Sequence, residues 1–473
     1  MTRIPVCMEV PERVQTRLWY AAEELLRPLA AAPVAVERGD LGETGVYVGP
    51  SPEAAPGGAL RIRHREATAA SLLSEQPIST RVIEDGEVAR LGDAPLPFPL
   101  GESQPLADPQ EIIEIEPFAS AFWWLAGVQE RAFTVRDRWG RFPYEASLQA
   151  RFSRTLAPPV DTIRTWLVDA LRARGWDFPE PTWNGASWAV ALTHDLDATR
   201  TRRLRAALGD TARGRPASAL RRALGPDARR RSARALADLA RRHDIRSTLF
   251  AKAGQSGPED VRAEPERDAS WLRGLADDGF EIGLHPSMQA ATDGARLRAE
   301  RQRLERALGR PLAAVRSHYL RWDPAVTPAL YAAEGFGLDS TLGWSEGPGF
   351  RRGTAHPFRL WDADEERPSS LWEAPLAFME TPILEPLRLD PGLVLWLEPD
   401  LVVMSALNQV FEVARQVNGV AVVLWHNAMS DERLWRRTVE VLDELLGRAR
   451  DQGASFVTLS EAVGIAASRV DPN

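Results

Sequence analysis

Two aspartates, Asp195 and Asp197, follow a short apolar stretch that runs from Trp188 to Leu192. Such a run is typical of a buried strand, and residues two apart on a strand point to the same face. Two carboxylates brought together there repel each other unless a cation or a proton lies between them. A metal ion bound by one aspartate, with the other acting as a base, would remove that repulsion. The alternative is a pair of helix-capping or loop aspartates, and the stretch alone leaves both interpretations open.

Histidines fall at similar places farther along the chain. His285, His318 and His426 come just after predicted strands, and His194 lies beside the first aspartate. Each one alone could be an ordinary core or loop histidine. In β/α barrels, however, the carboxyl ends of the strands build the active site. The joint placement therefore predicts a site that combines imidazoles with carboxylates.

The elements that would position these residues alternate between strand and helix, which favours parallel β/α units. We predict strands over 189–192, 247–251, 281–284, 314–316, 337–339, 420–424 and 455–458. We predict helices over 231–242, 269–278, 295–308, 327–334, 404–416 and 432–452.

The length of 473 residues allows two or three domains. We expect a small α/β accessory domain over 1–110, with a helix over 11–29 and strands near 45–49 and 59–63. A helical connecting region over 111–185 should pack on a barrel formed by 186–473. His64, just after the second of these strands, is expected at the surface without a role.

An aromatic cluster in the connecting region allows two interpretations. Phe118, Phe122, Trp123 and Trp124 could form a platform for a sugar. Their helical spacing favours a place in the interdomain core instead, which is the interpretation we adopt.

Composition excludes several classes of protein. The net charge of −8 argues against nucleic acid as a general partner. Cys7 is the only cysteine, so neither an intrachain disulfide nor a thiolate-based zinc cluster can form. The first residues lack the apolar core of a signal peptide, and no run reaches membrane-spanning length. We therefore expect a soluble cytoplasmic protein without an integral membrane segment.

Six segments, taken in order, resemble the motifs of the polysaccharide deacetylase family. They are Thr193-His-Asp-Leu-Asp197, Arg246-Ser-Thr-Leu-Phe250, Glu281-Ile-Gly-Leu-His-Pro-Ser287, Val315-Arg-Ser-His-Tyr319, Gly337-Leu-Asp-Ser-Thr341 and Val423-Leu-Trp-His-Asn427. The resemblance covers roughly 186–470 and implies an α/β fold, the deformed (β/α)7 NodB-like barrel. It also implies a divalent metal, commonly zinc, and hydrolysis of N- or O-acetyl groups on glycans. The amino-terminal part is similar to a domain of unassigned function that accompanies some of these deacetylases.

The resemblance assigns metal ligands residue by residue. It implies that Asp195 is the general base and that Asp197 and His285 bind the metal. The second histidine of the family's His-x-x-x-His motif is replaced here by Gln289, a weaker ligand for zinc. His318 is then the candidate third ligand, at a position where the family more usually has proline. Gln289 remains the alternative to His318.

The same resemblance assigns the remaining catalytic roles. It implies that the Tyr319 backbone N–H stabilises an oxyanion and that Arg316 orients the base. His426 matches the family's catalytic acid, with Asp339 as a possible charge partner.

Two further segments allow an ordinary and a functional interpretation. Between 200 and 246 arginines far outnumber acids, which indicates a solvated helical face or a contact with an anionic or lipid-linked precursor. The glycine-rich segment 344–358 is either a long connection or a sugar subsite. The subsite would be lined by Trp344, Phe350, Arg351 and His356.

The sequence thus predicts a metal-dependent hydrolase that removes acetyl groups from a sugar, a glycan or a glycan precursor. Because the second motif histidine is missing, a catalytically degenerate glycan-binding or assembly protein remains an alternative. A hydrolase of another non-peptide C–N bond is a third possibility.

Overall fold

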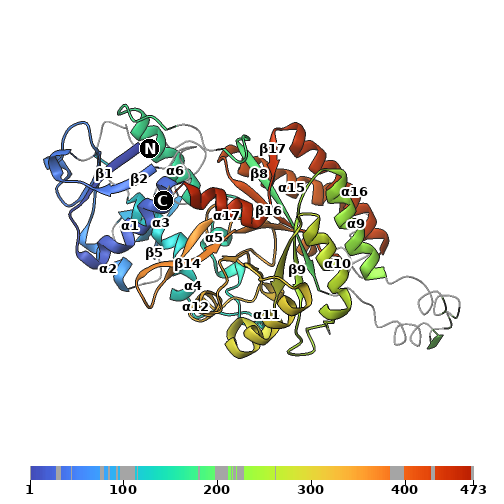
Figure 1. The fold of residues 1–473 in the computed structure, drawn as a ribbon. Coiled ribbons are helices and arrows are strands. Elements are labelled where there is room, and N and C mark those ends of the chain that lie inside the picture. The colour runs from blue at the N-terminus through green and yellow to red at the C-terminus, as the bar shows by residue number, and fades with distance from the viewer. Residues whose placement is uncertain are drawn as a thin grey trace.

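The computed structural model has an amino-terminal part, blue to cyan in Figure 1, beside a larger barrel-like part, green to red. The structure describes all residues except 1, 28–33, 44, 75–78, 84–85, 92–93, 96–111, 114–115, 179–181, 198–210, 213, 215, 217–219, 221–227, 262, 384–398, 428–431 and 470–473. Among the described residues, no helix is both long and apolar enough to cross a membrane.

The amino-terminal part contains a parallel sheet with the strand order β2-β1-β3-β4 and a small antiparallel sheet, β5-β6-β7. The predicted helix over 11–29 and the strands near 45–49 and 59–63 are confirmed as α1, β3 and β4. In chain order the elements are β1 (Thr2–Met8), α1 (Glu12–Leu26), β2 (Val34–Arg38), β3 (Val46–Gly49), β4 (Leu60–Arg63), α2 (Glu66–Ser74), β5 (Ser79–Ile83), β6 (Gly86–Leu91) and β7 (Ala94–Pro95).

His64 does not lie at the surface as expected. Only 5% of its area is exposed, and its ring is hydrogen-bonded to Glu116, the residue before α3. Glu116 is 52 positions away in the sequence, so the local pattern around His64 contained no sign of this partner.

The connecting region is helical, as predicted. Its helices are α3 (Pro117–Leu125), α4 (Val128–Ala132), α5 (Leu148–Arg151) and α6 (Pro159–Arg172). All four aromatic side chains of the cluster in α3 are at most 2% exposed. Phe122 contacts Trp361 of the barrel part, with ring centroids 5.2 Å apart. The cluster is therefore interdomain core, and the prediction is confirmed.

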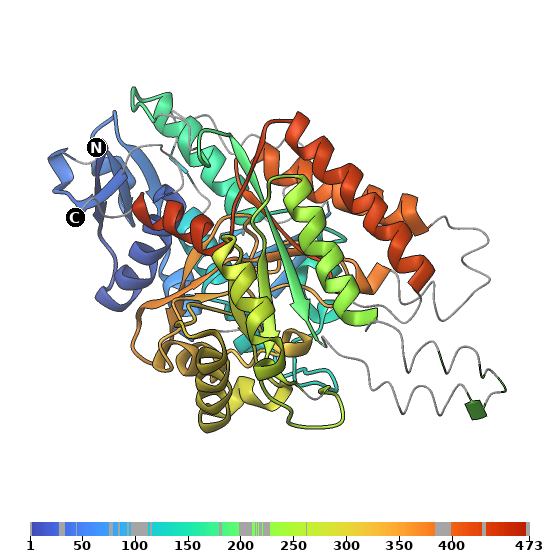
Figure 2. The same cartoon turned by 45° about the vertical axis from the view of Figure 1, so that its right-hand side comes forward.

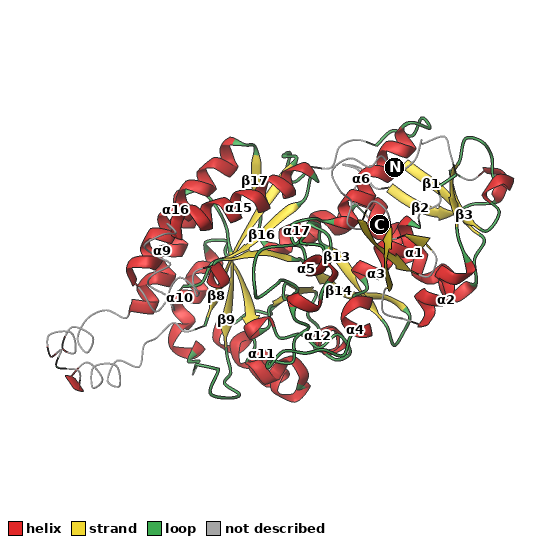
Figure 3. Ribbon diagram, turned by 180° about the vertical axis from the view of Figure 1, so that it is seen from behind, coloured by secondary structure: helices red, strands yellow, loops and turns green. Residues whose placement is uncertain are grey.

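The barrel part is built on a ten-stranded, mostly parallel sheet with the order β13-β14-β12-β11-β10-β9-β8-β16-β15, and β17 also pairs with β8. Its elements are β8 (Trp188–Leu196), α9 (Ala228–Arg242), β9 (Thr248–Lys252), α10 (Pro265–Asp277), β10 (Glu281–His285), α11 (Gly294–Leu308), β11 (Ala314–Val315), α12 (Thr327–Ala333), β12 (Leu338–Asp339), β13 (Phe358–Asp362), β14 (Arg367–Glu373), β15 (Leu376–Met379), α15 (Pro399–Gln416), β16 (Val420–Leu424), α16 (Glu432–Asp451), β17 (Ala454–Phe456) and α17 (Leu459–Ser468). Helices lie along its outer side, as Figures 2 and 3 show.

The sheet curls into an incompletely closed barrel, in agreement with the predicted fold class. Strands β14 and β15 are separated only by residues 374–375, yet they lie near opposite ends of the path of paired strands. The two ends can be joined by so short a segment only if the sheet bends round until they approach each other. All seven predicted strands belong to this sheet, whereas β13, β14, β15 and α17 were not predicted.

In strand β8, alternate side chains point to opposite faces of the sheet. Every residue of β8 is buried. Ala189 and Ala191 belong to the cluster of buried residues inside the curl, whereas Val190 and Leu192 belong to the main core beneath the helices. The strand is longer than predicted, because it continues through Leu196. Side chains at odd positions therefore point into the barrel, which directs the first aspartate of the motif inward.

Candidate metal and active site

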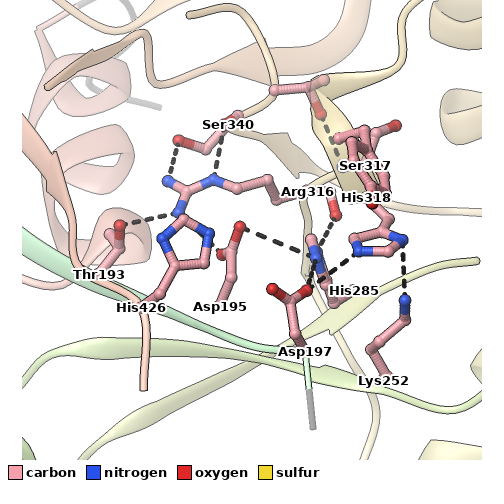
Figure 4. A network of polar contacts seen from close by, with 12 residues as sticks. Thr193, Asp195, Asp197, Lys252, His285, Arg316, Ser317, His318, Ser340 and His426 are labelled. Carbon is pink, nitrogen blue, oxygen red and sulfur yellow. Dashed lines mark hydrogen bonds and ion pairs between the residues drawn. The ribbon is translucent and has the colours of Figure 1, made fainter. Parts of the chain in front are cut away.

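The polar side chains predicted from the strand ends gather at one end of the barrel (Figure 4). Asp195 lies at the end of β8, His285 is the last residue of β10, and His318 lies three residues after β11. His426 lies two residues after β16. Because these strands are parallel, their carboxyl ends meet on one side of the sheet, as in other β/α barrels.

Three of these residues form a group that could hold a metal ion. Asp197 Oδ1 lies 3.2 Å from His285 Nε2 and 3.1 Å from His318 Nε2. One ligand atom from each of the three lies within 4.8 Å of the others. Ligands about 2.05 Å from a tetrahedral ion are about 3.3 Å apart, so the observed spacing suits a first-row divalent metal.

The hydrogen bonds around the two imidazoles also favour metal binding. His285 Nδ1 lies 2.8 Å from the Arg316 carbonyl and donates to it, which leaves Nε2 with a lone pair. His318 Nδ1 lies 2.6 Å from Asp260 Oδ1, and a proton donated from Nδ1 to this oxygen would leave Nε2 with a lone pair as well. Two lone pairs and a carboxylate oxygen thus face one another. Asp197 Oδ1 is buried and faces these two imidazole nitrogens, as expected for a group of atoms that can surround a cation.

Asp260 and Lys252 hold His318 in place. Lys252 Nζ lies 2.6 Å from Asp260 Oδ1, so this oxygen accepts from both the ammonium and the imidazole. Backbone N–H groups of Ser256 and Met288 donate to the other oxygen of Asp260. Ligating histidines are usually fixed by a carboxylate in this way. From the sequence, Lys252 was recognisable only weakly, as a charged residue at the end of a buried strand, and Asp260 was not recognisable at all.

The charges of the group act on one another in the metal-free protein. Burial opposes ionisation of Asp197, but the imidazoles of His285 and His318 hold its pKa well below the usual range. Burial likewise disfavours charge on His318, yet Asp197 and Asp260 raise its pKa above the ordinary value. A divalent ion would take the place of the proton that His318 otherwise binds.

Asp195, the predicted base, lies beside the metal-ligand group and is held by a buried arginine. Arg316 Nη1 lies 3.1 Å from Asp195 Oδ1 and 2.8 Å from Thr193 Oγ1. The other nitrogens of the guanidinium donate to Ser340, and its plane lies over Phe250, 4.5 Å from the ring centroid. Hydrogen bonds and the contact with Phe250 therefore hold the Arg316 guanidinium in one orientation. This is the position required for its predicted role of orienting Asp195.

His426, the predicted acid, is paired with Glu380 and not with Asp339. Glu380 Oε1 accepts from both the backbone N–H and Nδ1 of His426, each at 2.9 Å. Asp339 instead accepts from Thr341 and is paired in the sheet with Glu373. The prediction of Asp339 as the charge partner is wrong because β12 and β16 lie on different sides of the curl. Burial raises the pKa of Asp339 to about 6 and that of Glu373 well above its usual value.

The charge of Glu380 decides the protonation of His426. Burial alone would lower the pKa of this imidazole, but Glu380 outweighs burial, and Asp197 and Asp195 add to its effect. Together they raise the pKa of His426 to about 10. Both aspartates belong to the site, and the raised pKa of His426 favours the protonated imidazole at neutral pH.

Gln289 and Tyr319, the two remaining residues predicted for the site, both have exposed side chains. Gln289 is exposed, and the metal-ligand group contains His318 in its place. Tyr319 follows His318 directly, and 39% of its area is exposed. Its backbone N–H remains the predicted oxyanion donor.

In the glycine-rich segment 344–358 the four side chains predicted to line a sugar subsite are buried, whereas residues 345–348 are half-buried or exposed. Trp344, Phe350, Arg351 and His356 are each at most 3% exposed, so no sugar can reach them in this conformation. Arg351 instead forms an ion pair with Glu130 of the connecting region.

The arginine-rich segment is described only in part, because 198–210 and several later positions lie outside the described residues. In α9, Arg230, Arg241 and Arg242 pair with aspartates of neighbouring helices. These contacts fit the solvated helical face and lend no support to an anionic or lipid-linked partner.

The curled sheet and the residues at its strand ends define an incompletely closed α/β barrel with a group of side chains that could hold a divalent metal ion. A family model described as "Family of unknown function (DUF7033)" matches residues 53–175, which span parts of both predicted amino-terminal segments. No curated protein matches the chain.

Solved structures with some likeness to the chain include three hydrolases. A protein described as a polysaccharide deacetylase from Mycobacterium smegmatis is 18% identical, with a TM-score of 0.41, 61% of this chain covered and 93% of that one. One similarly described from Pseudomonas aeruginosa PAO1 is 16% identical, with a TM-score of 0.43 and coverages of 63% and 97%. Puue allantoinase is 14% identical, with a TM-score of 0.41 and coverages of 62% and 94%. At such values the likeness assigns no activity.

Proposed function

We propose that this chain is a metal-dependent hydrolase that removes N- or O-acetyl groups from a sugar, a glycan or a glycan precursor. The observation that carries the proposal is one constellation at the barrel's end. It combines the possible metal ligands Asp197, His285 and His318 with an arginine-held carboxylate, Asp195, and a charged imidazole, His426.

Hydrolysis of an acetyl amide or ester needs an activated water molecule, a stabiliser for the tetrahedral oxyanion and an acid for the leaving group. A divalent ion on the three ligands would polarise the acyl carbonyl and make water more acidic. Zinc is the ion we propose, because two imidazoles, one carboxylate and an open position are typical of catalytic zinc.

Different residues of the chain would carry out the two proton transfers. Asp195, held in place by Arg316, accepts a proton from the attacking water. His426, kept protonated by Glu380, donates one to the leaving amine or alcohol. The Tyr319 N–H donates to the oxyanion. The ordered motifs and their resemblance to polysaccharide deacetylases support an acetylated carbohydrate as the substrate.

The base is tested with Asp195→Asn, assayed for acetate release from a panel of N- and O-acetylated sugars and oligosaccharides. We expect metal content and fold to be retained and the rate to fall by about a hundredfold or more, the usual scale for a positioned base. Retained activity would assign the base elsewhere. If the unaltered protein binds glycans but releases no acetate, it is a binding protein. Hydrolysis of cyclic amides without acetate release would indicate another C–N hydrolase.

The ligands are tested by elemental analysis of purified variants. Asp197→Ala, His285→Ala and His318→Ala should each lose the divalent ion, because two remaining ligands hold it poorly. Gln289→Ala is the matched control and should keep the ion, since its side chain is exposed. Loss of metal in Gln289→Ala with retention in His318→Ala would show that the third ligand is misassigned.

A further inference from the structure

A tight turn over residues 137–141, between α4 and α5, reaches from the connecting region to the metal-ligand group. Asp137 Oδ1 accepts from the backbone N–H groups of Trp139 and Arg141, at 2.8 and 2.9 Å. Asp137 Oδ2 accepts from Arg141 Nε at 2.8 Å. Burial opposes ionisation of Asp137, but its bonds to Arg141 lower its pKa. The turn is therefore rigid, and Arg141 extends from it in a fixed direction.

Two contacts join this turn to Tyr319, the residue after the possible metal ligand His318. Arg141 Nη1 donates to the Tyr319 carbonyl at 2.7 Å. The Trp139 ring lies against the Tyr319 ring, with centroids 5.0 Å apart and planes tilted by 31°. The Tyr319 ring in turn lies 4.5 Å from the His318 ring. A continuous row of rings thus leads from the turn to His318.

The backbone beside His318 needs support of this kind. Tyr319 has φ 60° and ψ 17°, and Leu320 has φ 51°. The left-handed region is unfavourable for residues other than glycine, so two such residues in succession persist only where their surroundings hold them. The Arg141 hydrogen bond fixes the carbonyl between them.

We propose that the turn over 137–141 positions His318 for metal binding by holding Tyr319 in its left-handed conformation. Arg141 is the positioning residue and acts through Tyr319. The turn lies within the residues matched by the family of unknown function, so part of that region serves the metal site. The inference rests on the proposed function for the identity of the ligands.

The first test measures Co²⁺ binding by competition with a chromophoric chelator and by the visible spectrum of the loaded protein. Arg141→Met should weaken binding about tenfold or more, the usual effect of losing a group that orients a ligand, and should change the spectrum. Arg141→Lys should restore part of the affinity because it keeps one donor. Arg154→Met, an exposed arginine of the same region, is the control and should leave both readouts unchanged.

The second test needs no metal. Hydrogen exchange of the backbone amides of 318–321 should become faster in metal-free Arg141→Met and not in Arg154→Met. Unchanged exchange, or unchanged Co²⁺ affinity and spectrum in a folded Arg141→Met, would overturn the proposal. If the unaltered protein binds no Co²⁺ while exchange still responds to Arg141→Met, the proposed metal function fails and the bracing of Tyr319 stands.

Discussion

His426 shows how one neighbouring charge can set the function of a side chain. Its Nδ1 and backbone N–H both donate to Glu380 Oε1, which leaves Nε2 as the nitrogen that can give a proton to a substrate. Burial alone would make this imidazole neutral, yet Glu380 raises its pKa to about 10. A divalent ion nearby would lower this value and bring the acid closer to neutral pH.

Glu380→Gln tests this role through the pH dependence of kcat/KM. An acid must be protonated to act, so activity falls as pH rises through the pKa of His426. Because the glutamine carries no charge, the pKa of His426 should fall, and the alkaline limb should move to lower pH by about one unit or more. Thr381→Val removes a neutral partner of the same nitrogen and should leave the limb in place. An alkaline limb that does not move in Glu380→Gln would mean that another group is the acid.

At the scale of elements, small residues inside the curl allow the strands to surround the site. Gly283 of β10 is packed so closely that an added Cβ would lie 2.7 Å from Phe250 and 3.0 Å from the Ala314 carbonyl oxygen. Phe250 in turn supports the Arg316 guanidinium. The absence of a side chain at Gly283 therefore helps to position the group that orients Asp195.

Gly283→Ala should destabilise the protein by about 1–3 kcal/mol, because the backbone oxygen of Ala314 cannot yield to the new methyl group. The free energy of unfolding in urea measures this effect. Gly274→Ala is the matched control: Gly274 lies in α10 with open space around it, so the change should stabilise by about 0.5–1 kcal/mol. Equal effects of the two substitutions would contradict this account of the packing.

At the scale of the whole molecule, the amino-terminal part and the barrel part share one core. A single cluster of buried apolar residues extends from Ile4 to Ala449. Glu130 of α4 also pairs with Arg351 of the barrel part, and both side chains are only 2% exposed. Burial opposes ionisation of Glu130, but Arg351 and Arg352 lower its pKa. We therefore expect the two parts to unfold together.

Glu130→Gln should lower the free energy of unfolding by about 3–5 kcal/mol, because it leaves buried guanidinium groups without a counter-charge. Hydrogen exchange should show protection lost together in β1 and in β8. Glu412→Gln breaks an exposed pair with Arg415 and should cost at most about 1 kcal/mol. Separate unfolding of the two parts, with only the amino-terminal one affected, would show that they are energetically independent.

Elements whose signal is local could be predicted from the sequence alone. All seven strands and all six helices predicted for the barrel part are present. They could be predicted because apolar runs and helical periodicity within a segment show which of its residues are buried. The gathering of Asp197, His285 and His318 was also predictable, since parallel strands bring their carboxyl ends to one side. Strand β14 was missed because its segment, Arg367–Glu373, contains proline and serines and lacks a clear alternation.

Which side chains contact one another in the site depends on the tertiary fold. Glu380 partners His426 from 46 positions away, Asp260 holds His318 from 58, and Arg141 reaches Tyr319 across 178. These pairings depend on strand order, on the curl of the sheet and on the packing of the connecting region. No local sequence pattern predicts these pairings. Hydrogen bonds and ion pairs between residues far apart in the sequence form only when the complete fold brings the residues together.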